Sequence, residues 1–355
     1  TTTGTPGSAT AWTKIEVTTS TTSTLYFYCT NHSGMGGEID IPNNYFLSSA
    51  NDRMICGGGE TSAGSFQNTI QMIQMRSKGN ASDYGDLSLG RQSLAKGCIS
   101  STIRGLFYAG DDSGPATYVN NIDFITMATT GNAIDFGDAT ADDSGGAGFS
   151  NQTRGGRGGG FTGTSNPFGS NIIDYVTIAS TGNASDFGDL TSVRYGNAGL
   201  SSPTRGVSGG GATYTGSTVY QNIIDYITIA STGNSTDFGD LLQAGDNMAG
   251  ASSATRGVFI GGVVSAPNPQ NVMQYITIAS TGNAQDFGDL VTAMRAGGGN
   301  SNGTSGILMG GYTPGLSNTI QEITIASTGN AEDFGNLALT TADCGAVSPN
   351  HGGLQ

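Results

Sequence analysis

One phrase recurs along this chain of 355 residues and constrains its fold more than any other feature. It reads STGNASDFGDL in one copy, and five close variants accompany that copy. The glycine of its Gly-Asn step recurs at separations of 52, 51, 51, 49 and 47 residues, at Gly79, Gly131, Gly182, Gly233, Gly282 and Gly329. Such a near-constant period is typical of folds in which one supersecondary unit follows another around a continuous core.

The residues between these phrases form short apolar runs separated by polar turns, without the 3.6-residue spacing of an amphipathic helix. We predict four strands in each repeat. Strand one precedes a turn such as SSPTRG, strand two ends at paired glycines, strand three is NIIDYITIAS and strand four is DFGDL. The Ser-Thr-Gly-Asn step between strands three and four predicts a tight turn, because Gly and Asn tolerate positive φ. The chain is therefore expected to be all-β.

These features resemble the kelch repeat. The shared ones are an Arg-Gly-x-x-x-Gly-Gly strand, an Asp-Tyr-Ile-Thr-Ile strand, an aromatic last strand and a following Leu-x-x-x-Arg, here Leu190 to Arg194. The resemblance covers residues 42–355 and implies a kelch-like β-propeller with blades of four antiparallel strands. Kelch blades tend to carry Trp where this chain has Tyr84, Phe136, Phe187, Phe238, Phe287 and Phe334. We expect these rings to fill the space between blades.

The number of half-repeats predicts how the ring of blades closes. An Arg-Gly turn marks the first half of a repeat at Arg53, Arg104, Arg154, Arg205 and Arg256, and Ser305 and His351 take its place afterwards. Seven first halves thus accompany six second halves, which favours seven blades, with six as the alternative. A ring closes best when both termini share a blade, because an unpaired strand edge would otherwise be exposed. We expect strand-like runs within residues 1–41, AWTKIEV and TLYFYC, to supply the missing strands.

Composition and charge exclude several classes of function. The net charge is −14, from 27 acidic and 13 basic residues, and no basic stripe is available to follow a phosphate backbone, so we expect no nucleic-acid partner. No apolar run approaches the ~20 residues of a membrane helix, so membrane insertion is not expected. No cluster of non-repeated polar residues indicates a catalytic centre or a cofactor, and we therefore predict a protein that is not an enzyme.

A metal-like motif lies in the N-terminal segment, residues 1–41. Cys29, His32 and Met35 follow the ligand order of the closing loop of a blue-copper site, and the phrase resembles the end of a cupredoxin. Such a site needs a second histidine far upstream, and the 28 residues before Cys29 contain none. We predict a cupredoxin-like remnant without a working copper centre.

The repeated Asp-Phe-Gly-Asp step has two interpretations. Calcium is one, because aspartates recur there near other oxygen donors, although the sixth copy has Asn336 and the dense D-x-D-x-D spacing is missing. The favoured interpretation is structural: the aspartates accept hydrogen bonds from turn amides. The aspartates concerned are Asp86, Asp138, Asp189, Asp240 and Asp289.

The loops after the paired glycines differ completely between repeats. In an up-and-down blade, the links from strand two to strand three and from strand four to the next blade emerge on the same face. We predict that this face binds a ligand, because aromatic and polar loops on a rigid scaffold suit glycan or protein recognition; neutral drift of surface loops is the alternative. The candidate residues are Phe66, Tyr118, Phe161, Phe168, Tyr214, Tyr220 and Tyr312, with Arg91, Arg194 and Arg295 from the other links.

The wording of the tandem TIASTGNAxDFGDL phrase resembles repeats in predicted structural proteins of marine bacteriophages, especially cyanophages. The resemblance implies a non-enzymatic virion protein, a fibre, appendage or decoration, in the virion or outside the cell. Expected partners are other virion proteins, a host surface glycan or receptor, and further copies of this chain. The alternative is a secreted carbohydrate-active propeller enzyme or a bacterial cell-surface adhesin.

Overall fold

The computed structural model describes residues 52–62, 65–112, 118–163 and 168–355, together with four short strands nearer the N-terminus. These four are β1 (Thr2–Thr3), β2 (Trp12–Thr13), β3 (Thr24–Tyr28) and β4 (Gly36–Asp40), which pair as β1–β2 and β3–β4. The chain divides into two compact units, Thr1–Ser49 and Ala50–Gln355. In the described residues, no helix is of the length and apolar character that a membrane span requires.

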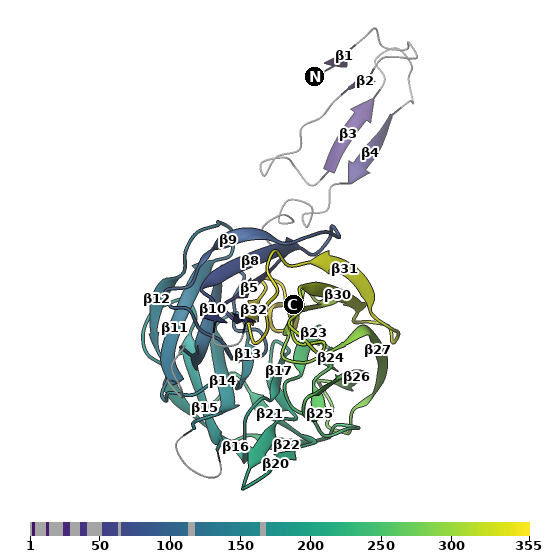
Figure 1. Cartoon of the computed structure of the whole chain (residues 1–355). Helices are drawn as coiled ribbons and strands as arrows, with labels where there is room; N and C mark the ends of the chain where they lie inside the picture. The colour runs from purple at the N-terminus through teal and green to yellow at the C-terminus, as the bar shows by residue number, and fades with distance from the viewer. Residues whose placement is uncertain are drawn as a thin grey trace. The chain divides into compact units, whose positions relative to one another are not determined.

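Within the described part of the second unit, six antiparallel sheets surround one axis, as Figure 1 shows. Blade 1 contains β5 (Arg53–Gly57), β8 (Thr69–Gln74), β9 (Ser82–Asp86) and β32 (Gly345–Val347). Blade 2 contains β10 (Arg104–Asp111), β11 (Tyr118–Thr126) and β12 (Ile134–Asp138), and its inner position is held by residues 98–100 through a Ser100–Gly105 bridge. Blade 3 contains β13 (Ala147–Ser150), β14 (Arg154–Gly160), β15 (Ser170–Thr177) and β16 (Ser185–Arg194).

The remaining blades repeat this order. Blade 4 contains β17 (Ala198–Ser201), β18 (Arg205–Gly209), β21 (Ile223–Thr228) and β22 (Thr236–Asp240). Blade 5 contains β23 (Ala249–Ser252), β24 (Arg256–Ile260), β26 (Asn268–Thr277) and β27 (Gln285–Met294), with β25 (Val263–Ser265) beside β26. Blade 6 contains β28 (Gly298–Ser301), β29 (Ser305–Met309), β30 (Thr319–Thr324) and β31 (Glu332–Asn336). The prediction of an all-β propeller is confirmed.

The ring closes in blade 1, and the described residues form six blades, the alternative, in place of the favoured seven. The C-terminal strand β32 pairs with β5, so that Gly345 lies opposite Gly57 and Val347 opposite Ile55. The seventh first half therefore supplies only the innermost strand of blade 1, whose second strand is β5. The strand that residues 1–41 were expected to provide at this position comes from the C-terminal end of the chain.

The recurring phrase forms the joint between neighbouring blades. The amide of Asp189 in blade 3 donates to Oδ1 of Asn234 in blade 4 at 3.1 Å. The same contact recurs around the ring and joins blade 6 to blade 1, where the amide of Asn336 donates to Asn80. The amide acceptor is thus the asparagine of the turn, which corrects the expectation that the aspartates accept these bonds. The neighbouring aromatic rings fill the joints as expected, each no more than 3% exposed: Tyr84, Phe136, Phe187, Phe238, Phe287 and Phe334.

Buried ion pairs reinforce three of these joints. Asp225 of blade 4 is fully buried and accepts hydrogen bonds from Arg194 of blade 3 at 2.6 Å and from the hydroxyl of Thr191 at 2.7 Å. Asp123 of blade 2 pairs in the same way with Arg91 of blade 1, at 3.3 Å. Between blades 2 and 3, one arginine in strand two contacts two carboxylates: Arg157 with Asp143 and Asp174.

The other three joints have a glutamine where these blades have the buried aspartate, namely Gln71, Gln274 and Gln321. Each glutamine accepts a backbone N–H of the preceding blade; Oε1 of Gln321, for example, lies 3.0 Å from the amide of Thr292. The residue in the place of Arg194 is then uncharged, and it is Met294 in blade 5. A joint therefore carries charge on both sides or on neither, which avoids an uncompensated buried ion.

The C-terminus fills the axial channel at the end where strands one and two are connected. His351 is 1% exposed and precedes the short 3-10 helix η2 (Gly352–Leu354). Its Nε2 lies 3.1 Å from Oγ of Ser150, and its Nδ1 accepts the N–H of Gly353 at 3.1 Å. Burial lowers the pKa of His351 to about 4, because the imidazolium form would lose its hydration there.

Candidate functional site

Two sets of links meet at the opposite end of the propeller. Antiparallel bridges join the link after strand two to the link after strand four, as in Ser144 with Phe161, Tyr195 with Ala212, and Arg295 with Tyr312. The expectation that both kinds of link share one face is confirmed, and we call this end the loop face.

A ring of residues with left-handed backbone, the rim, surrounds the channel mouth on the loop face. Its members have φ between 51° and 67°: Ser93, Gly145, Gly196, Asn247, Ala296 and Asp343. From Gly145 onward, each member donates its N–H to the carbonyl of the preceding member at 2.6–2.8 Å. Because positive φ is costly for Ser, Asn, Ala and Asp, these hydrogen bonds hold the rim in a conformation that an isolated chain would avoid.

Inside the rim lies a hollow of about 270 Å³. Lys96 crosses the hollow from the joint between blades 1 and 2. Its Nζ donates to Oδ1 of Asn247 at 2.5 Å and to Oδ1 of Asp343 at 3.0 Å. Asn247 belongs to the opposite joint of the ring, between blades 4 and 5. Lys96 therefore spans the hollow from one side of the ring to the opposite side.

Sequence reasoning missed Lys96, although the spacing of the repeats contained a signal. Eleven residues separate Ser93 from Arg104, whereas nine separate Gly196 from Arg205 in the equivalent link. Lys96 lies in this two-residue insertion. An insertion confined to one repeat, and carrying one of the few lysines, marks a place where the ring departs from its symmetry.

Aromatic side chains form one wall of the hollow. The rings of Tyr118 and Tyr195 meet Phe161 edge-on, with their centroids 5.7 and 4.9 Å from the centroid of Phe161. Phe168 stacks on Phe161 at 5.9 Å, and Tyr214 lies 5.3 Å beyond it. Four of the seven predicted aromatic residues thus gather in one cluster. Tyr195 was missed because it lies in the link after strand four, where only arginines were considered.

Of the predicted aromatic residues, only Tyr118 and Phe161 line the hollow; Phe168 and Tyr214 lie behind Phe161, and the other three have different surroundings. The hydroxyl of Tyr312 donates to Glu60, and the guanidinium of Arg295 lies 4.4 Å from the centre of the Tyr312 ring. The hydroxyl of Tyr220 accepts a backbone N–H from blade 5 at 3.0 Å. Phe66 lies opposite Glu60 in the hairpin formed by β6 (Glu60–Ser62) and β7 (Ser65–Phe66). In blade 4 the corresponding loop forms a hairpin of β19 (Ala212–Tyr214) and β20 (Thr218–Tyr220).

Two of the three arginines expected on the loop face are not on its surface. Arg91 and Arg194 have no exposed side-chain surface, because each is held in a buried ion pair with the next blade. Burial lowers the pKa of both guanidinium groups, and the paired carboxylates oppose that shift. The expectation that they contact a ligand is therefore wrong, and only Arg295 remains at this face.

Carboxylates surround the hollow. Asp111 and Asp343 line it, and Asp246 lies behind the rim at 5% exposure. Burial raises the pKa of Asp246 to about 6, against an opposing effect of Lys96. Burial also raises the pKa of Asp111, as do the negative charges of Asp112, Asp343 and Glu60. The loop face therefore combines an aromatic wall with a negative electrostatic field.

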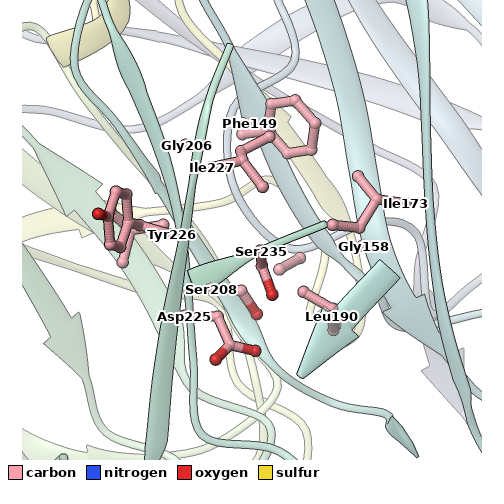
Figure 2. A pocket seen from close by; sticks show the side chains of 12 residues that line it. Phe149, Gly158, Ile173, Leu190, Gly206, Ser208, Asp225, Tyr226, Ile227 and Ser235 are labelled. Carbon is pink, nitrogen blue, oxygen red and sulfur yellow. The ribbon is translucent and has the colours of Figure 1, made fainter. Parts of the chain in front are cut away.

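A second cavity, between blades 3 and 4, is too small to be a ligand site. Figure 2 shows that it is lined by apolar groups such as Phe149, Ile173 and Leu190. Its volume of about 10 Å³ is at the lower limit for one water molecule. Gly158 of β14 and Gly206 of β18 are also among its lining residues.

The structure provides no metal site among residues 52–62, 65–112, 118–163 and 168–355, where no group of three or more His, Cys, Asp or Glu side chains is arranged to hold an ion. The copper-like motif of Cys29, His32 and Met35 lies outside the described residues. Its status as a remnant stays a prediction.

Comparison with protein-family models finds no match for this chain, and comparison with curated proteins finds no similar sequence.

Proposed function

We propose that this protein is a non-enzymatic structural protein of a phage virion, a fibre, appendage or decoration, and that its loop face binds a carbohydrate of the host surface in the axial hollow. The observation that carries the binding proposal is the hollow itself, in which Tyr118, Phe161 and Tyr195 stand beside Lys96 and the carboxylates. Aromatic rings pack against the C–H faces of sugars, and polar groups around them fix the hydroxyls.

The size and rigidity of the hollow suit the end of a glycan chain. Its volume of about 270 Å³ is slightly below that of pockets that enclose drug-sized ligands, about 300–1,000 Å³. The rim is fixed by backbone hydrogen bonds, so that little conformational freedom remains to be lost on binding. The virion assignment is supported by the repeated TIASTGNAxDFGDL phrase, and other virion proteins are the expected neighbours of the propeller.

A glycan array probed with the purified protein tests the binding proposal. We expect binding to a limited set of glycans, and a loss of affinity of about tenfold, or about 1.4 kcal/mol, for Tyr195→Ala and Phe161→Ala. Val291→Ala, which trims a side chain that is 62% exposed on β27, serves as the control, and melting temperatures identify variants that have lost stability. A blank array contradicts the proposal. Loss of binding in Tyr220→Ala together with full binding in Tyr195→Ala would move the site out of the hollow.

Two further measurements distinguish the proposal from its alternatives. Incubation of a bound polysaccharide with the pure protein should leave the chain length unchanged; turnover would establish the carbohydrate-active enzyme instead. Mass spectrometry of purified phage particles should detect this protein as a component. Its presence on a bacterial surface and absence from particles would favour the adhesin.

A further inference from the structure

Among the described residues, the hollow is lined by one ammonium group, that of Lys96, and its charge is already paired with a carboxylate. Lys96 is buried and donates to Asn247 and Asp343 at 2.5 and 3.0 Å. An acidic sugar entering the hollow would have to compete with Asp343 for this lysine. The hollow is therefore poorly suited to an anionic ligand.

The carboxylates around the hollow, by contrast, retain acceptor capacity. Oδ2 of Asp111 has one long hydrogen bond, 3.4 Å from Nε2 of Gln92, and its Oδ1 has no partner among the described residues. Asp246 is only 5% exposed, and its Oδ1 likewise lacks a hydrogen-bond partner in the described part of the chain. Its Oδ2 lies 3.4 Å from where a Cβ on Gly196, a residue lining the hollow, would stand. An unpartnered carboxylate oxygen in such a place favours a donor that arrives with a ligand.

The charges that face this region have an acidic excess. Glu60, Asp111, Asp112, Asp246 and Asp343 are the acidic groups, and Lys96 and Arg295 are the basic ones. The wall adds the negative faces of aromatic rings, which attract a cation when it lies over the ring. Both contributions act in the same direction, and the net charge of −14 adds to them at long range.

We infer that the hollow selects saccharides with a free, protonated amino group over their N-acetylated and acidic counterparts. The ammonium group would lie against the wall of Tyr118, Phe161 and Tyr195 and donate to Asp111, while the sugar ring packs on the aromatic faces. This inference rests on the proposed glycan function and names the class of sugar that the site takes.

Two short oligosaccharides with the same backbone test the inference. Oligomers of glucosamine and of N-acetylglucosamine, of equal length, are titrated into the full chain at pH 7 by isothermal calorimetry. We expect the glucosamine oligomer to bind about tenfold more tightly, the effect of a charge-assisted hydrogen bond in place of a neutral one. Asp111→Asn should abolish most of this preference. Asp142→Asn makes the same change of charge at an exposed residue outside the lining and should leave the preference intact.

The outcomes separate this inference from the proposed function. Equal affinities, tighter binding of the N-acetylated oligomer, or binding of neither oligomer overturns the inference, while the glycan proposal stands if the array shows other ligands. A preference that survives Asp111→Asn, or that is lost in Asp142→Asn, also overturns it, because the preference would then come from the overall negative charge. A blank array removes the proposed function and the inference together.

Discussion

We expect the Arg194→Met variant to lose about 3–5 kcal/mol of folding free energy, because the substitution leaves the fully buried Asp225 without its countercharge. The hydroxyl and the backbone amide of Thr191 still donate to this carboxylate, at 2.7 and 3.2 Å, but two neutral donors do not compensate a buried ion. In a domain of this size, 1 kcal/mol corresponds to about 2 °C in melting temperature, so the variant should melt about 6–10 °C lower.

The double variant Arg194→Met with Asp225→Gln should recover most of this loss. It copies the uncharged joint between blades 5 and 6, where Met294 and Gln321 occupy the same positions. There Gln321 accepts the amide of Thr292 at 3.0 Å and donates to its carbonyl at 3.1 Å, so that no buried group is left unpaired. We expect the double variant to lie within about 1 kcal/mol of the parent, since a buried ion pair gains little over a satisfied neutral pair.

Differential scanning calorimetry of the parent, both single variants and the double variant measures the coupling between the two positions. The single variant Asp225→Gln should also be strongly destabilised, because it leaves Arg194 buried without an anion. Additive losses in the double variant would refute the reasoning. So would a melting temperature of Arg194→Met equal to that of the parent.

Three further predictions follow from the ends and joints of the ring. The pKa of His351 is about 4 in the folded protein, below the ordinary value of 6.5, so the unfolded chain takes up the proton first. The free energy of unfolding should therefore fall by about 3 kcal/mol as the pH drops from 6.5 to 4. The variant His351→Gln should remove this part of the pH dependence, and urea midpoints at both pH values check it. Deleting residues 345–355 removes β32 and exposes the inner edge of β5, so the melting temperature should fall sharply, and an unchanged value would contradict the role of β32 in closure. Asn234→Ala should cost about 1 kcal/mol by leaving the amide of Asp189 without its acceptor, whereas Asn234→Asp, which keeps an acceptor oxygen, should cost less; equal losses in chemical denaturation would argue against the joint.

The sequence predicted the strands because their signals are local and repeated. The turn before Arg205, the paired glycines after β18 and the Ser-Thr-Gly-Asn step each recur in register, and every copy reinforces the assignment of the others. The burial of Phe187 and its equivalents was predictable for the same reason. A residue that packs against the neighbouring blade in every repeat recurs at the same position of the repeated sequence.

The blade number could not be read in the same way, because the count depends on where each blade begins and not on how many half-repeats exist. The first and last halves supply β5 and β32 of a single blade, a pairing between strands almost 300 residues apart. Arg91 and Arg194 were misplaced because their partners are on the next blade. Asp225 and Gln321 occupy equivalent positions, and the reason that one is charged and the other neutral becomes clear only when the facing residue, Arg194 or Met294, is known.

The diameter of the opening to the hollow is set by the backbone of the rim. Its members are Ser, Gly, Asn, Ala and Asp, all short side chains on the same left-handed backbone, and the hydrogen bonds that hold them run between main-chain atoms. Exchanging Ser93, which lines the hollow, for another short residue would change the chemistry at the opening and leave the ring of backbone hydrogen bonds unaltered. Five rim residues line the hollow: Ser93, Gly145, Gly196, Asn247 and Asp343. Substitutions at these positions would therefore change which ligands are admitted while the size of the opening stays constant.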